Sequence, residues 1–261
     1  MKPSQHEKAE RFAALHEAAC FVMPNPWDAG SARALAGLGF AALATSSGAA
    51  AGVLGRRDGE LTRDEALAHA RAIVEATDLP VAADLENGFG DAPEDAAATI
   101  RLAAAAGLVG GSIEDASGVA DRRIYELSHA VERIAAAAEA ARAQPFAFTL
   151  TARAENFLRG RPDLDDTIRR LQAYESAGAD VLFAPALPDL DAVRTVCASI
   201  GKPLNFMVGM KDRSFSVDEL RAAGVRRISL ATSLYRAAMA GLMAAATEVQ
   251  QQGSFCYVDR L

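Results

Sequence analysis

The stretch AGADVLFAP, residues 177–185, shows the unit from which the whole chain is built. A polar, Ala-rich segment ends at Gly178, and a short run of apolar residues follows at once. Glycine is common where a helix ends, because it adopts left-handed backbone angles without steric cost. Residues 222–232, AAGVRRISLAT, have the same order, and Gly37 and Gly107 precede apolar runs in the same way. The unit therefore predicts a helix, a glycine stop and then a strand.

Eight apolar runs along the chain predict eight strands. They are almost continuously hydrophobic instead of alternating with polar residues, which is typical of parallel strands covered on both faces. The predicted strands are residues 20–24, 41–45, 80–84, 110–114, 146–153, 180–185, 203–209 and 227–232.

Amphipathic segments that predict helices lie between these runs. Thr62 with Glu65, and Ser216 with Glu219, have the spacing of a capping box, which marks a helix start. The predicted helices are residues 29–38, 63–76, 93–106, 126–143, 165–177, 189–200, 217–223 and 233–251, with an extra one at 5–18.

Eight strand–helix units without a linker favour an α/β fold, a single-domain (β/α)8 TIM barrel over residues 1–261 with an extra N-terminal helix. The alternative is an open doubly wound sheet, which alternates in the same way. It is less favoured because no GxGxxG motif follows the first predicted strand.

Composition narrows the classes of partner. The chain has 27 basic and 34 acidic residues, a net charge of −7, which argues against nucleic acid as a partner. No apolar stretch reaches the ~20 residues of a membrane span, and the polar first ten residues show no signal peptide. Three cysteines without CxxC spacing fit a reducing compartment. We therefore expect a cytoplasmic protein with no membrane partner.

Three carboxylates form the strongest chemical signal. Asp84, Glu86 and Glu114 follow adjacent predicted strands, and barrels place their catalytic groups at these carboxyl ends. Such a cluster repels itself unless a cation lies within it, and oxygen ligands suit Mg²⁺ or Mn²⁺. The alternative is that these acids only cap the helices that follow them. We predict a metal site formed by the three.

An anion site is predicted beside the metal. Arg153 ends a buried strand, and its planar fork suits a carboxylate, although a plain salt bridge to Glu155 or Glu114 is an equal alternative. The small-residue turn of Ser47, Gly48 and Ala49 offers backbone N–H groups that would hold substrate oxygens.

Three further residues complete the predicted site. Asp58 follows the second strand and would support water bound to the metal, although a simple turn explains it equally well. Trp27 follows the first predicted strand, and Asn205 lies within the seventh. We predict that both residues contact substrate. We expect Arg153, Glu114 and Asp58 to be the catalytic residues.

At these motifs the sequence resembles the phosphoenolpyruvate mutase/isocitrate lyase superfamily, including carboxyphosphonoenolpyruvate phosphonomutase and 2-methylisocitrate lyase. DLENGFG (84–90) is similar to the family's Asp-x-Asp-x-Gly-Tyr-Gly signature, with Glu86 in place of the second Asp. The resemblance implies a metal-linked Glu114, a substrate-binding Arg153 and a Ser-Gly turn that holds the substrate's acid group. The other matching motifs are NPWDAGSA (25–32), TSSGAAAG (45–52), GRRDG (55–59), SIED (112–115), TARAENF (151–157) and YESAGADVLFAP (174–185).

The segment after the fourth predicted strand departs from the family. Lyases of the family have a Lys-Lys-Cys-Gly-His loop there, and mutases have a Lys, but residues 115–123 contain no Cys, Lys or His. The chain thus resembles a divergent member of the family that lacks the catalytic-loop Cys, and neither lyase nor phosphonomutase chemistry transfers directly.

Three functions stay open at this point. The first is a Mg²⁺-dependent lyase or decarboxylase that acts on a small 2-oxo or 2-hydroxy acid through an enolate. The second is a phosphonomutase or hydrolase of the same superfamily, and the third is a barrel that only binds an oxo acid. The Ala- and Met-rich segment 233–251 has an apolar surface too broad for one barrel wall, which favours a homo-oligomer, a dimer or tetramer.

Overall fold

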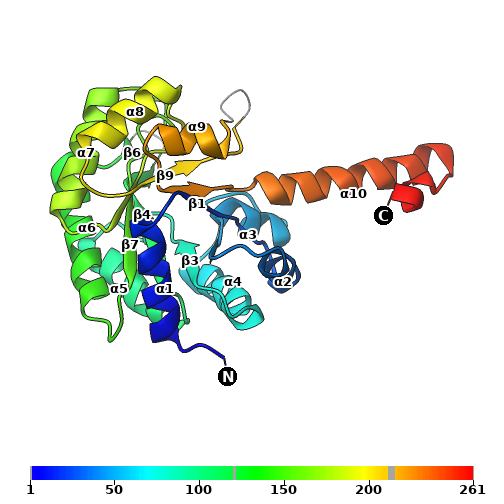
Figure 1. Cartoon of the computed structure of the whole chain (residues 1–261), viewed down its shortest axis with the longest axis horizontal. Coiled ribbons are helices and arrows are strands. Elements are labelled where there is room, and N and C mark those ends of the chain that lie inside the picture. Colours follow the sequence, from blue (N-terminus) through cyan, green and yellow to red (C-terminus); the bar gives the residue numbers. More distant parts are fainter. Residues whose placement is uncertain (1, 120–121, 211–214, 261) are drawn as a thin grey trace.

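Eight parallel strands stand side by side in the order β1-β10-β9-β8-β7-β4-β3-β2 in the computed structural model, which describes residues 2–119, 122–210 and 215–260. This order confirms the predicted (β/α)8 barrel (Figure 1). The strands are β1 (Phe21–Met23), β2 (Leu43–Ala44), β3 (Val81–Asp84), β4 (Gly110–Glu114), β7 (Thr149–Arg153), β8 (Val181–Phe183), β9 (Leu204–Met207) and β10 (Arg227–Ser229).

The barrel closes between β1 and β2 through single hydrogen bonds. The Ala44 N–H donates to the Pro24 carbonyl at 3.1 Å, and the Asn25 side chain donates to the Thr45 carbonyl at 2.9 Å. The Asn25 Oδ1 also accepts from the Leu230 N–H at 2.9 Å. Asn25 therefore ties β1 to both of its neighbours, because an amide can donate and accept at once.

Helices cover the outside of the barrel, and their ends follow the predicted signals. Both predicted capping boxes form, at Thr62–Glu65 and Ser216–Glu219. The outer helices are α2 (Ala29–Gly37), α4 (Arg63–Ala76), α5 (Pro93–Ala105), α6 (Leu127–Arg142), α7 (Leu164–Ser176), α8 (Leu190–Ser199) and α9 (Val217–Ala222).

The glycine stops need one correction. Gly107, Gly178 and Gly224 have φ of 92°, 105° and 98°, as predicted. Gly37 instead remains the last residue of α2, and Gly39 has the left-handed φ of 88°. The helix continues to Gly37 because nothing in that turn requires a left-handed residue before Gly39.

The predicted extra helix, α1 (Gln5–Glu17), closes the amino-terminal end of the barrel, which we call the floor. Its Phe12 is fully buried with Ala82 and Val109 of the strand region. Gly110 permits this contact, because a Cβ there would lie 2.9 Å from the Phe12 ring. The floor is therefore sealed by apolar side chains.

Two elements after β2 and β4 were not predicted. The Ser-Gly turn begins a short helix, α3 (Ser47–Val53), whose first N–H groups are capped by the Ser46 side chain. The segment after β4 forms a hairpin of β5 (Ala116–Val119) and β6 (Arg122–Ile124), with residues 120–121 outside the described part. Both elements lie at the carboxyl ends of the strands, where barrels carry their active sites.

The last long helix, α10 (Ser233–Gln252), extends away from the barrel as an arm (Figure 1). None of its residues is buried, and a short 3₁₀ helix, η1 (Cys256–Arg260), follows it. Leu242 and Met243 on this arm are 57% and 60% exposed. Within the described ranges, no helix has the length and apolar character needed to cross a bilayer.

Candidate active site

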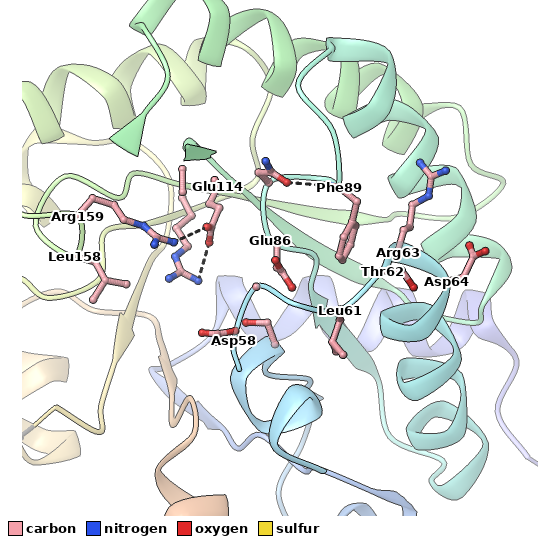
Figure 2. Close-up of a pocket in the computed structure, with 16 residues that line it drawn as sticks. Asp58, Leu61, Thr62, Arg63, Asp64, Glu86, Phe89, Glu114, Leu158 and Arg159 are labelled. Atoms are coloured by element: carbon pink, nitrogen blue, oxygen red, sulfur yellow. Dashed lines mark hydrogen bonds and ion pairs between the residues drawn. The ribbon is translucent and has the colours of Figure 1, made fainter. Parts of the chain in front are cut away.

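A cavity of about 820 Å³ lies at the carboxyl ends of the strands, which we call the mouth of the barrel (Figure 2). Four of the predicted site residues line it together with Asp58: Ser47, Glu86, Glu114 and Arg153. Parallel strands end at one edge, so residues distant in sequence meet there.

Arg153, at the end of β7, is the centre of this cluster. Its Nη1 lies 3.2 Å from Glu114 Oε2 and 3.9 Å from Asp84 Oδ2, and its Nε lies 2.5 Å from Glu155 Oε1. Burial opposes the charge, but the carboxylates of Glu155, Glu114 and Asp84 outweigh it and raise the pKa of Arg153 above its usual range. Both salt bridges considered from the sequence are present.

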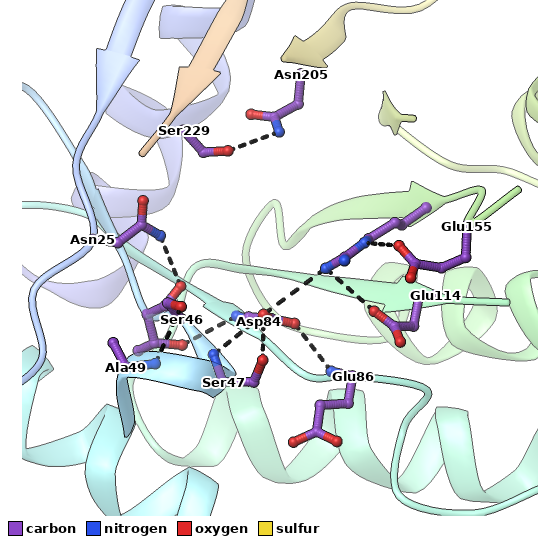
Figure 3. Close-up of polar contacts among 12 residues, drawn as sticks. Asn25, Ser46, Ser47, Ala49, Asp84, Glu86, Glu114, Glu155, Asn205 and Ser229 are labelled. Atoms are coloured by element: carbon purple, nitrogen blue, oxygen red, sulfur yellow. Dashed lines mark hydrogen bonds and ion pairs between the residues drawn. The ribbon is translucent and has the colours of Figure 1, made fainter. Parts of the chain in front are cut away.

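Asp84, the last residue of β3, is held by its neighbours (Figure 3). Its Oδ2 accepts from the Ser47 hydroxyl at 2.9 Å and the Ser47 N–H at 3.2 Å. Its Oδ1 accepts from the Glu86 N–H at 3.2 Å. These contacts fix the carboxylate in one orientation toward Arg153.

Glu86 has an unusual environment for an acid. Its backbone has φ of 50°, a left-handed value that is rare outside glycine. Burial raises the pKa of Glu86 to about 7, and the nearby charges of Asp84 and Asp58 add to this. Its Oε1 is buried without a hydrogen-bond partner among the described residues. A buried carboxylate oxygen of this kind calls for a proton or a cation.

Glu114, at the end of β4, is almost completely buried. Burial raises its pKa well above the usual value, against the opposing charge of Arg153. Its second oxygen, Oε1, lies 3.1 Å from Nη2 of Arg159, a residue of the segment after β7. Glu114 is therefore shared between two guanidinium groups.

The Ser47, Gly48 and Ala49 amides are partly used within the protein. The Ser47 N–H donates to Asp84, and the Ala49 N–H donates to the Ser46 hydroxyl at 3.4 Å. Gly48 packs closely, since a Cβ there would lie 2.9 Å from Thr232 and 3.3 Å from the Asp58 carboxyl. Asp58 thus lies against the predicted turn, at the cavity wall.

Trp27 and Asn205 are placed differently from the other predicted contacts. The Trp27 ring packs edge-on against Tyr235 of α10 at 5.9 Å, and Trp27 is not among the residues that line the mouth cavity. Asn205 lies deeper, on β9, where it donates to the Ser229 hydroxyl at 3.1 Å. Its role as a substrate contact stays a prediction.

Sequence reasoning missed Arg159 as a site residue. It lines the mouth cavity and bridges Glu114 and the fully buried Glu155, whose Oε2 lies 2.9 Å from its Nε. The signal was available, because Arg159 follows Glu155 by four residues and charged pairs at that spacing often meet.

The donor set fits a hard cation. Asp84, Glu86 and Glu114 offer only oxygen, and the unpaired Glu86 Oε1 is the acceptor that most needs a cation. The described residues contain no group of three His, Cys, Asp or Glu side chains placed to hold a metal directly. Mg²⁺ needs no such group, because it usually keeps several waters and takes one or two carboxylates.

Comparison with known proteins agrees with this geometry. The family model described as phosphoenolpyruvate phosphomutase matches residues 12–250. The chain belongs to the phosphoenolpyruvate mutase/isocitrate lyase superfamily. A solved protein of Burkholderia cenocepacia J2315 is 54% identical, with a TM-score of 0.96 over 98% of this chain and 92% of that one.

Curated relatives of this superfamily member include a lyase and a decarboxylase. The 2-methylisocitrate lyase of Escherichia coli (strain K12) is 33% identical over 74% of this chain and 67% of its own length. The oxaloacetate decarboxylase of Chromohalobacter salexigens is 31% identical over 91% of this chain and 83% of its own length.

Proposed function

We propose that this protein is a Mg²⁺- or Mn²⁺-dependent lyase or decarboxylase that acts on a small 2-oxo or 2-hydroxy acid through an enolate. The observation that carries the proposal is the buried Arg153, surrounded by carboxylates at the wall of a deep cavity. Relatives named for 2-methylisocitrate and oxaloacetate, both carboxylic acids, support the substrate class.

Arg153 would bind and orient the substrate. Its guanidinium contacts Glu155, Glu114 and Asp84 and also lines the mouth cavity, where it would donate to a substrate oxygen. A guanidinium held on two sides needs no reorganisation when charge develops on that oxygen, which is how preorganised donors lower a barrier.

Asp84, Glu86 and Glu114 would hold the metal, one or two of them directly and the rest through its waters, with Asp58 close to those waters. When bound, the metal supplies Lewis-acid stabilisation of the enolate oxygen. The hydrogen bonds from Ser47 and from the Glu86 N–H keep the Asp84 carboxylate in place for that task.

A substrate panel tests the proposal. The purified protein is offered oxaloacetate, dimethylmalate, methylisocitrate, isocitrate and phosphonopyruvate with Mg²⁺, and products are followed by NMR. We expect turnover of a small oxo or hydroxy acid that stops on addition of EDTA. Turnover of phosphonopyruvate alone would make it a mutase or hydrolase, and oxalate binding without any turnover would make it a binding barrel.

We also propose that the chain forms a homo-oligomer through α10. The arm exposes Leu242 and Met243, and Phe255 beyond it is 63% exposed. Exposed apolar surface on the outer part of such an arm is normally covered by a partner. A reducing cytoplasm as its location is consistent with three free cysteines.

A further inference from the structure

A second cavity, of about 70 Å³, lies inside the barrel below the mouth. Every strand of the barrel contributes a lining residue, and several of these are as small as Ala44, Ala82 and Gly111. Small side chains on one wall leave the interior incompletely filled, whereas barrel interiors are usually packed with branched residues.

Arg227 of β10 lines this cavity and has no acidic partner among the described residues. It is 3% exposed, and its three nitrogens donate to neutral acceptors: Asn205 Oδ1 at 2.8 Å, Thr151 Oγ1 at 2.9 Å and His16 Nε2 at 3.2 Å. Burial alone lowers the pKa of Arg227 to about 9. A buried guanidinium is costly unless a negative charge compensates it.

His16 does not supply that charge, and its proton is placed by its contacts. Its Nδ1 lies 2.8 Å from the Phe12 carbonyl, which can only accept, so Nδ1 carries the hydrogen. Its Nε2 is then the acceptor for Arg227. Burial, with a smaller effect of Arg227, lowers the pKa of His16 to about 3, so the ring is neutral.

Two hydroxyl groups near Arg227, those of Thr151 and Ser229, line the same cavity. The Thr151 hydroxyl accepts from Arg227 and the Ser229 hydroxyl accepts from Asn205, so each keeps its own proton to donate. Figure 3 shows Asn205 and Ser229 joined by this hydrogen bond, apart from the contacts around Asp84. Asp84 and Arg153 line the upper end as an ion pair at 3.9 Å.

We propose that the barrel interior binds a small monovalent anion against Arg227, Asn205 and Ser229. Its size is that of chloride or formate, because a cavity of about 70 Å³ holds only a few molecules as small as water. The site does not depend on the proposed reaction, and it is tested without metal or substrate.

Thermal unfolding in the presence of EDTA provides the test. Sodium chloride or bromide is exchanged for sodium gluconate at constant ionic strength, since gluconate is too large for the cavity. We expect the Tm to rise by about 2–3 °C for each tenfold increase of halide above its Kd. The rise is expected to vanish in Arg227→Met and to remain in Arg226→Met, a matched control in which the exposed neighbour is changed.

If Arg227→Met does not fold, the site can still be tested in the wild type. A crystal of the wild-type protein is soaked in bromide for this purpose. An anomalous peak beside Arg227 supports the site, and the absence of both a peak and a halide-dependent Tm refutes it. An equal rise in Arg226→Met, Arg227→Met and wild type also refutes it.

The terminal carboxylate of a bound substrate has the same chemistry as a free anion, and oxalate separates the two. If a free anion occupies the site, bromide leaves the Kd of oxalate unchanged, and both bind together. If a carboxylate of the bound acid occupies it, bromide raises that Kd competitively. Once the Tm and the bromide soak have shown binding at Arg227, the first result assigns the site to a free anion and the second assigns it to a carboxylate of the bound acid.

Discussion

The mouth and the floor of this barrel each contain a buried arginine, and the groups around the two guanidinium groups differ in charge. Arg153 at the mouth has three carboxylates within 4 Å, beside a cavity of about 820 Å³. Arg227, toward the floor, has only neutral partners, and one of them is His16 of the helix that seals the barrel. The same side chain is thus surrounded by negative charge at one end and by neutral groups at the other.

The pKa values of the two guanidinium groups follow this difference. At the mouth the carboxylates outweigh burial and raise the pKa of Arg153, whereas burial acts alone on Arg227 and lowers its pKa to about 9. We expect substitutions at the mouth to change activity and substitutions at the floor to change stability, in line with the general division of barrels.

The largest expected effect is that of Asp84→Ala at the mouth. If Asp84 is a metal ligand as proposed, its loss should lower the rate by at least about 10³-fold, because it removes stabilisation of the developing oxyanion. Mg²⁺ should raise the Tm of the wild type only, measured by differential scanning fluorimetry.

Asp64→Ala is the control, since Asp64 lines the same cavity but is not in the predicted metal set. It should keep both activity and metal stabilisation. An Asp84→Ala protein that Mg²⁺ still stabilises would contradict the metal site.

The second effect concerns substrate choice at the mouth. We expect methylisocitrate and isocitrate to be cleaved about 10²–10⁴ times more slowly than a small acid such as oxaloacetate, because a general acid of that worth is missing. Burial, reinforced by Asp91, raises the pKa of Tyr125 beside the hairpin to about 12, so it is a poor proton donor. Coupled assays of pyruvate and glyoxylate on one preparation measure the ratio of these rates. Fast methylisocitrate cleavage would contradict the prediction and show that the chain resembles its Escherichia coli relative in activity too.

The third effect is on the stability of the floor. The pKa of His16 is about 3 in the folded chain and 6.5 when unperturbed. The neutral ring therefore contributes fully to the free energy of unfolding above pH 6.5, and this contribution is lost as the pH falls toward 3. Between pH 7 and pH 4.5 this amounts to about 2–3 kcal/mol. Urea unfolding should show that His16→Gln, which does not titrate, loses that much less on acidification. An equal loss in both proteins would contradict the assignment.

The smallest effect on chemistry is expected on α10, away from both ends. Leu242→Glu together with Met243→Glu should give a particle of one chain, 27.3 kDa, by light scattering at micromolar concentration, with the barrel still folded. Gln251→Glu on the same helix is the control and should leave the assembly intact. A wild-type protein that is already monomeric would contradict the oligomer.

The sequence by itself determined the repeating unit and the order of the site. Continuously apolar runs follow glycines at which helices end, and these runs predicted the strands of the barrel. Strands that are covered on both faces have apolar residues at successive positions. Since all eight strands run parallel, the chain order alone predicted that Asp84, Glu114 and Arg153 would meet at one end. The structure brings them together as expected.

Only the tertiary structure decided how the site is completed. Nothing in the sequence distinguished a turn from the helix α3, because a small-residue run after a serine suits both. Arg159 entered the site because the segment after β7 folds back onto Glu114, a contact 45 residues away in sequence.

Arg226 and Arg227, at the start of β10, show most clearly what the sequence could not predict. Neighbouring residues of a strand point to opposite faces, so one of Arg226 and Arg227 had to point into the barrel. Two adjacent arginines carry no sequence signal that distinguishes the inward one. Pairing of Arg227 with Phe21 on β1 and Asn205 on β9 sets the register that turns Arg227 inward and leaves Arg226 exposed. A shift of the register by one residue would turn Arg226 inward and Arg227 outward. The packing of the whole barrel therefore determines which arginine is buried.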